Sequence, residues 1–142
     1  MKIAFDHQVF TMQRYGGISR YFFNLIEGLQ KINQQPKVFA GVYQNQYLPK
    51  LDAELYSGYP ILKYPKGTGR FFNLGNHYFT QNQIKRFAPD IIHETYYSQV
   101  GVKDVGIPRV VTVYDMIHEL FPESFPKNDP LPKWKRRALE NA

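Results

Sequence analysis

The joint between the first predicted strand and the first predicted helix constrains the fold of this chain most. Residues 1–5 form an apolar run that predicts a buried strand. Beyond the segment Tyr15-Gly16-Gly17-Ile18-Ser19-Arg20, apolar residues recur at positions 18, 22, 25 and 29, which predicts a helix with one apolar stripe. The paired glycines allow a tight turn and the close approach of a ligand, and the first turn of a helix offers free N–H groups to phosphate or another anion. The alternative is a plain left-handed turn that leads into a helix.

Strands and helices alternate along the rest of the chain, which is typical of a parallel α/β sheet. We therefore predict a Rossmann-like parallel sheet with helices on both faces. Because the chain ends inside or just after its last predicted helix, with no further strand to pack it, we expect a truncated half of a larger protein. The predicted strands cover residues 2–5, 37–43, 61–64, 90–94 and 109–115, and the predicted helices cover 17–31, 71–87 and the residues from 133 onward, with a loop and a short helix over 44–59.

Composition excludes several classes of protein. The 142 residues contain no cysteine, so disulfides, thiolate catalysis and cysteine-based zinc sites are excluded. No apolar run approaches the length of a membrane span, and the first residues do not resemble a signal peptide, so we expect a cytoplasmic protein. The net charge of +6 permits anionic partners, but the basic residues are mostly dispersed and no nucleic-acid-binding motif occurs. We therefore expect no nucleic acid as a partner.

One basic cluster stands near the end of the chain, around Trp134. It consists of Lys133, Lys135, Arg136 and Arg137. Such a segment allows peripheral contact with an anionic membrane. The alternative is a solvated helix face with Trp134 docked on the core.

Polar residues follow three of the predicted strands. Asp6 and His7 follow the first strand, residues 93–97 end the fourth and extend beyond it, and Asp115 ends the fifth, with His118 and Glu119 shortly after it. Ligands of open parallel sheets bind beyond the carboxyl ends of the strands, so these segments and the glycine loop are expected to meet in one crevice. Each has a simpler alternative: His93 as a hydrogen-bonded strand-end residue, and Asp115 or Glu119 as a helix cap.

The chemistry of this crevice is limited by the motifs that are missing. The histidines lie on separate segments without metal-ligand spacing, so no metal is expected. The chain contains no Gly-x-Ser-x-Gly nucleophile elbow, no phosphate-binding loop of the Gly-Lys-Ser/Thr type and no Gly-x-Gly-x-x-Gly fingerprint. An anion-tolerant crevice with aromatic and acid/base groups remains. It suits a sugar or phosphosugar whose hydroxyl is oriented or deprotonated by a carboxylate or a histidine.

Three segments in order resemble glycosyltransferase family 4, whose members have the GT-B fold. Residues 10–22 resemble the glycine-rich opening of that family, residues 89–93 resemble its Pro-Asp-apolar-apolar-His strand, and residues 108–122 resemble its Thr-Val-His-Asp strand and loop. The final helix, residues 134–142, resembles the one that leads to a Val-Ser-Glu strand. The family's histidine in the third motif is Tyr114 here, and a second histidine common after the one matching His93 is Thr95.

This resemblance implies that residues 1–142 are the acceptor-side, N-terminal domain of a retaining, metal-independent sugar transferase. The domain that binds the UDP- or GDP-linked sugar would lie outside this chain, which alone would be inactive. No cofactor is implied beyond the donor substrate. The acceptor would be a sugar or a lipid-linked sugar in polysaccharide or glycolipid assembly, at the inner face of the membrane. The alternative function is a stand-alone Rossmann-like module that binds an anionic small molecule without catalysis.

The resemblance also implies roles for particular residues. Asp115 and His118 would be catalytic, close to the acceptor and the reacting sugar. The residues expected to bind substrate or phosphate are Gly16, Gly17 and Arg20, facing the donor diphosphate, together with His93, Glu94 and Tyr96.

Overall fold

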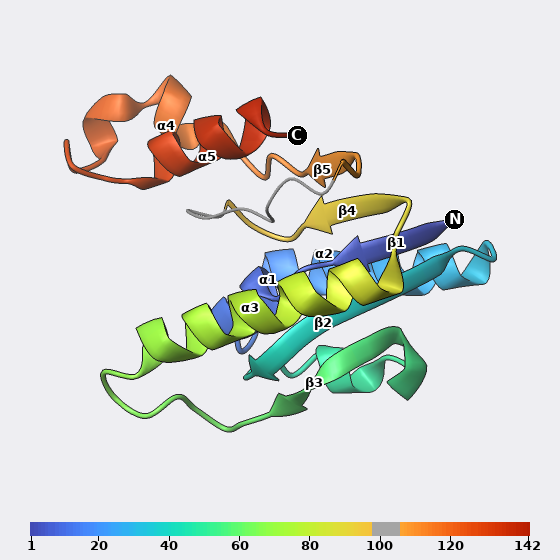
Figure 1. The fold of residues 1–142 in the computed structure, drawn as a ribbon. Helices are drawn as coiled ribbons and strands as arrows, with labels where there is room; N and C mark the ends of the chain where they lie inside the picture. The colour runs from blue at the N-terminus through green and yellow to red at the C-terminus, as the bar shows by residue number, and fades with distance from the viewer. Residues whose placement is uncertain (98–105) are drawn as a thin grey trace.

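The computed structural model describes residues 1–97 and 106–142, which form one five-stranded parallel sheet with flanking helices (Figure 1). The strand order is β3-β2-β1-β4-β5, and every neighbouring pair is parallel. The predicted parallel α/β fold is therefore confirmed. The strands are β1 (Lys2–Phe5), β2 (Gln35–Tyr43), β3 (Tyr56–Pro60), β4 (Ile91–Glu94) and β5 (Arg109–Val111).

Helices cover both faces of this sheet, as the sequence predicts. In Figure 1, α3 crosses the near face while α1 and α2 lie behind it, and α4 and α5 lie beyond the β5 edge. In the described part of the chain, no helix has the length and apolarity that a bilayer crossing requires. The helices are α1 (Gln8–Met12), α2 (Gly17–Lys31), α3 (Gly69–Phe87), α4 (Ile117–Leu120) and α5 (Leu131–Glu140), with short 3₁₀ turns η1 (Leu48–Lys50), η2 (Ala53–Leu55) and η3 (Pro122–Ser124).

The core has two layers because successive side chains of a strand point to opposite faces. Ile3 and Phe5 of β1 pack with Phe22 and Ile26 of α2 on one face. Ala4 of β1 packs on the other face with a cluster formed by Phe39, Ile84 and Ile92. The apolar stripe predicted for residues 17–31 therefore forms the main helical contribution to the larger layer.

The third strand lies earlier than the sequence predicts. β3 ends at Pro60, and the apolar pair that suggested a strand at residues 61–64 follows it, with Leu62 80% exposed. The reason is a close approach of two glycines. A Cβ on Gly58 would lie 2.3 Å from the Gly41 carbonyl oxygen, where the register of β2 and β3 shifts. Only a residue without a side chain allows this pairing, and a pattern of apolar residues does not reveal it.

Several further boundaries differ from prediction, and α3 and α5 each begin two residues earlier than expected, at Gly69 and Leu131. β5 ends at Val111 instead of residue 115. Beyond it, the side chains of Thr112 and Tyr114 contact His93 of β4 and the Thr95 carbonyl. β2 begins at Gln35, so Pro36 lies inside the strand, opposite Ile3. α1 was not predicted at all, since its five residues are too short to show a helical period.

Candidate functional site

A hydrogen-bonded network joins the segments that follow β1, β4 and β5. Asp6 Oδ1 accepts bonds from the Thr95 backbone N–H (2.9 Å) and from Thr95 Oγ1 (2.5 Å). Gln8 Nε2 donates to Asp6 Oδ2 (2.5 Å) and to the Tyr96 carbonyl (3.0 Å). Tyr114 Oη donates to the Thr95 carbonyl (2.7 Å). The structure thus brings together three of the segments that the sequence predicts to meet at the carboxyl edge of the sheet.

Thr95 and Tyr114, the two positions that depart from the family pattern, belong to this same network. In place of two histidines, the chain has a threonine that binds Asp6 and a tyrosine that binds the threonine's carbonyl. Burial raises the pKa of the Tyr114 hydroxyl, and the nearby Asp6 adds to this rise. Tyr114 is therefore a neutral hydrogen-bond donor at physiological pH.

Asp6 is enclosed by its partners and is only 2% exposed. Burial raises the pKa of its carboxyl, while the hydrogen bonds from Gln8 and Thr95 act in the opposite direction. The Asp6 side chain therefore fixes the positions of the segments around it and does not face solvent.

His93 and His7 are both buried among the packed elements. The His93 ring stacks on Phe5 with 5.4 Å between centroids and meets Phe22 edge-on at 5.2 Å, while its Nε2 contacts Thr112 Oγ1 at 2.9 Å. The ring nitrogens of His7 contact side chains of α3 at 3.1 and 3.2 Å. Burial lowers the pKa of each imidazole to about 4, so both rings are neutral at pH 7. These contacts are those of the simpler alternative for His93, a hydrogen-bonded residue at the end of a strand.

The glycine loop begins α2 in an extended conformation, not in the left-handed turn that was the alternative. Gly16 is the N-cap with φ 177°. Gln13 Oε1 accepts the Ser19 N–H (3.1 Å), and a Cβ on Gly16 would lie 2.2 Å from that oxygen. A Cβ on Gly17 would meet nothing within 4 Å. A side chain at position 16 would therefore displace the end of the Gln13 side chain, whereas position 17 is open to solvent.

This loop lies beside the network through α2. Phe22, in the second turn of that helix, contacts the rings of His93 (5.2 Å) and Tyr114 (6.4 Å). Arg20 is exposed in the first turn, and that turn carries no acidic residue. Gln13 occupies the Ser19 N–H, so the beginning of α2 presents the N–H groups of Gly17 and Ile18 and the Arg20 cation next to the carboxyl edge of the sheet.

Asp115 and His118 are oriented differently from each other. The Asp115 side chain is 49% exposed, and its Oδ1 accepts the Ile117 N–H (3.2 Å) in the turn before α4, whose N-cap is Met116. His118 Nε2 contacts Asp129 Oδ2 (3.2 Å), and its ring stacks on Phe125 at 3.8 Å. The contacts of His118 therefore lead toward residues 125–129, away from the network around Asp6.

Glu94 and Tyr96 differ in accessibility. Glu94 is 1% exposed and forms an ion pair with Arg109 of β5. Tyr96 is half-buried, and its ring stacks on Tyr114 with 6.0 Å between centroids. Tyr96 therefore keeps a partly open aromatic face at the edge of the sheet, and Glu94 is held inside it.

Lys135 holds the segment after β5 against α5, although the sequence shows it only as one member of a basic cluster. Its Nζ donates to the Asp115 carbonyl (2.8 Å) and to Glu119 Oε2 (2.9 Å), and its side chain is only 3% exposed. The bond from Lys135 holds the pKa of the Glu119 carboxyl below its usual range. Helical spacing could have indicated that Lys135 is buried, because position 135 lies on the same helix face as Leu131 and the buried Ala138.

No group of three or more His, Asp or Glu side chains suited to a metal ion occurs in the residues that the structure describes. Metal independence of the reaction stays a prediction.

A five-stranded parallel sheet with helices on both faces and a polar network at its carboxyl edge defines a domain of the Rossmann-like class. The family model described as Glycosyltransferase Family 4 matches residues 15–142, and the chain belongs to this family. Its activity class is therefore glycosyl transfer. No curated protein and no solved structure matches the chain.

Proposed function

We propose that this chain is the acceptor-side, N-terminal domain of an enzyme that transfers a sugar from a UDP- or GDP-linked donor to an acceptor hydroxyl. The reaction retains the anomeric configuration and needs no metal. A following domain binds the nucleotide. The product enters a cell-surface polysaccharide or a glycolipid, on the cytoplasmic side of the membrane. Membership of the family supports the proposal.

One structural observation carries the assignment of the donor side. Gly17 and Arg20 are exposed at the beginning of α2, and a side chain at position 17 would meet only open space. Free backbone N–H groups, the positive end of the helix dipole and one cation suit a diphosphate that gains charge as the sugar leaves.

The acceptor is proposed to lie nearer to Asp115 and Tyr96. Asp115 has a half-exposed carboxylate that can orient an acceptor hydroxyl, and Tyr96 has a partly open ring on which a sugar can stack. Lys135 is a positioning residue, because its bond to the Asp115 carbonyl fixes the segment that carries the carboxylate.

The direct test is transfer by the full-length protein beside this chain, with a panel of UDP- and GDP-sugars. We expect turnover of one donor by the full-length protein only, unchanged by EDTA, with retained configuration of the new bond by NMR. If neither form turned over or bound any nucleotide sugar, the stand-alone anion-binding module would be the better description.

Replacement of Gly17 by Glu should affect the stability of α2 and its binding of an anion in opposite directions. A carboxylate in the first turn of a helix is favourable by about 0.3–1 kcal/mol, so Gly17→Glu should keep or raise the thermal midpoint. The same charge repels a diphosphate, so KM for the donor should rise about tenfold or more. Kinetics and thermal unfolding of the full-length variant measure both effects.

Gly28→Glu is the matched control. Gly28 lies in the same helix, is exposed, and would also carry a Cβ into open space. The Gly28→Glu variant should leave KM for the donor within about twofold of the original value. Equal losses in both variants would show that the beginning of α2 does not bind the donor.

A further inference from the structure

The segment between β2 and β4 has an unusual charge. Residues 55–89 contain no Asp and no Glu, whereas they contain Lys63, Lys66, Arg70, Lys85 and Arg86. All five of these side chains are exposed, and none pairs with a carboxylate in the described part of the chain. This segment, formed mainly by the connection after β3 and by α3, is therefore a purely cationic surface.

The α3 helix contacts the sheet through both polar and apolar side chains and also carries apolar residues on its exposed side. Asn76 exchanges two hydrogen bonds with the Val42 backbone (2.7 and 2.8 Å), and Thr80 donates to the Phe39 carbonyl (2.8 Å). Ile84 is buried in the core, with Phe79 and Phe87 packed beside it. Three other apolar residues of the helix face solvent. Phe71, Leu74 and Tyr78, at i, i+3 and i+7, are 77%, 54% and 65% exposed. Water does not favour such a stripe, so the outer face of α3 is suited to an apolar environment.

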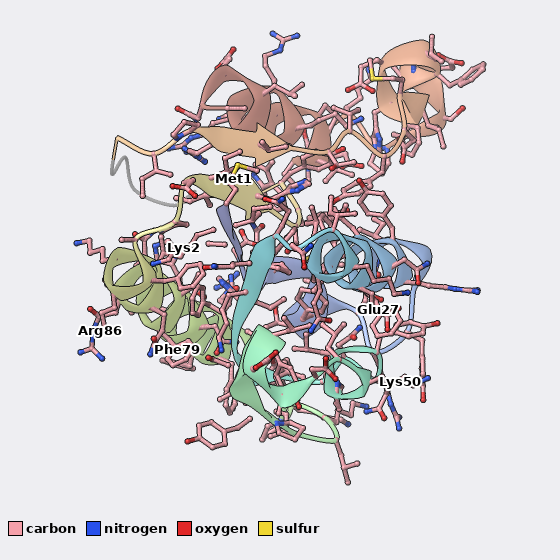
Figure 2. All side chains as sticks on the ribbon, turned by 90° about the vertical axis from the view of Figure 1, so that its right-hand side faces the viewer. Met1, Lys2, Glu27, Lys50, Phe79 and Arg86 are labelled. Carbon is pink, nitrogen blue, oxygen red and sulfur yellow. The ribbon has the colours of Figure 1, made fainter. Side chains whose placement is uncertain are left out.

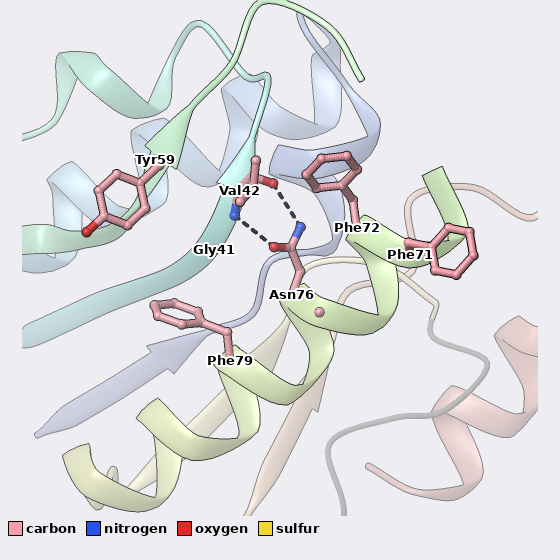
Figure 3. Close-up of a pocket in the computed structure, with 8 residues that line it drawn as sticks. Gly41, Val42, Tyr59, Phe71, Phe72, Asn76 and Phe79 are labelled. Carbon is pink, nitrogen blue, oxygen red and sulfur yellow. Dashed lines mark hydrogen bonds between the residues drawn. The ribbon is translucent and has the colours of Figure 1, made fainter. Parts of the chain in front are cut away.

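An apolar cavity of about 400 Å³ adjoins the same stripe, between α3 and the β2-β3 edge (Figure 3). Phe71, Phe72 and Phe79 line it from the helix and Tyr59 from β3. Tyr59 and Leu62 are 76% and 80% exposed, so the apolar surface continues past the cavity into the connection. Figure 2 shows the cationic end of the helix, where Arg86 extends away from the sheet while Phe79 lies toward it.

We propose that α3 and the connection at residues 61–70 form a docking surface for an anionic lipid bilayer. A helix of 19 residues lies along the plane of the interface, with Phe71, Leu74 and Tyr78 entering the boundary between headgroups and acyl chains. Lys63, Lys66 and Arg70 at one end, and Lys85 and Arg86 at the other, contact lipid phosphates. A second copy of the chain fits less well, because two such cationic faces repel each other.

This surface is separate from the basic cluster around Trp134. Lys135 of that cluster is buried and pairs with Glu119, and Glu140 lies on the same helix. In the described residues, no carboxylate pairs with the cations of the α3 surface. The two clusters therefore give a comparison at equal charge, which separates a specific docking face from general attraction between a basic protein and an anionic membrane.

The test is co-sedimentation of the chain with vesicles of equal parts phosphatidylglycerol and phosphatidylcholine, against vesicles of phosphatidylcholine alone. We expect binding to the anionic vesicles only. The triple variant Lys63→Gln, Lys66→Gln, Arg70→Gln should bind at least about tenfold more weakly. The matched triple variant Lys133→Gln, Arg136→Gln, Arg137→Gln should stay within about twofold of the original.

A second pair of variants tests the apolar contribution. Phe71→Ser should weaken vesicle binding about tenfold, since one aromatic side chain leaves the interface. Ile32→Ser, which replaces a 63% exposed apolar residue at the end of α2, should not change it. Circular dichroism checks that every variant is folded.

Three results would overturn the proposal: no binding to anionic vesicles, equal losses in the two triple variants, or equal effects of the two serine variants. A concentration-dependent dimer that Phe71→Ser abolishes, without vesicle binding, would assign the face to a second copy instead. No sugar donor is needed in these measurements, so their outcome is independent of the proposed transferase activity.

Discussion

Acidification from pH 6.5 to pH 4 should remove about 3 kcal/mol of folding free energy for each of two buried histidines. Burial lowers the pKa of His7 and of His93 to about 4, against 6.5 in an exposed chain. The unfolded chain therefore takes up protons first as the pH falls. The stabilisation is complete above pH 6.5 and is lost progressively toward pH 4. Urea unfolding at several pH values measures this dependence.

The variant His93→Gln measures how much one histidine contributes to the pH dependence of stability. Glutamine can still bond with Thr112 but does not titrate, so the loss of stability between pH 6.5 and pH 4 should shrink by about 3 kcal/mol. At pH 8 the same variant measures the cost of lost packing on Phe5 and Phe22 alone. The comparison is needed because burial raises the pKa of Asp6, whose protonation acts in the opposite direction. An unchanged pH dependence in His93→Gln would mean that the pKa of His93 is the same in the folded and the unfolded chain.

Arg109→Met should destabilise the domain by about 3–5 kcal/mol, because it removes the Arg109 cation that pairs with the Glu94 carboxylate inside the sheet. Glu94 is 1% exposed, and the Arg109 side chain is 13% exposed. The pair joins β4 to β5 at the edge where the candidate site begins. The free energy of unfolding in urea at pH 7 is the measurement.

Two control variants test whether the loss of stability comes from the buried ion pair. The double variant Glu94→Gln, Arg109→Met removes both charges and should recover most of the loss, since replacement of a whole buried pair is often nearly neutral. Arg136→Met removes an exposed cation from α5 and should cost less than about 0.5 kcal/mol. A cost below about 1 kcal/mol for Arg109→Met would show that the pair behaves like an ion pair in solvent.

The location of the candidate site follows from the sequence because it depends on strand order and polarity. Polar residues that end parallel strands meet at one edge, and Asp6, Thr95 and Tyr114 do so. The roles of the individual residues at that edge do not follow from the sequence. His93 and Asp115 are both polar residues at strand ends, yet the first is packed between aromatic rings and the second is half-exposed. Burial depends on neighbours that are distant in sequence, and no local pattern contains them.

The sequence by itself determined the parallel fold, the approximate bounds of α2 and the family. These depend on apolar period and on motifs within short segments, which are local properties. The tertiary structure alone decided the place of β3, the burial of Lys135 and the outward apolar face of α3. Each of these results from contacts between distant segments: Gly58 with Gly41, Lys135 with Asp115, and Asn76 with Val42. Such pairings decide which residues face the core, and they arise only when the chain is folded.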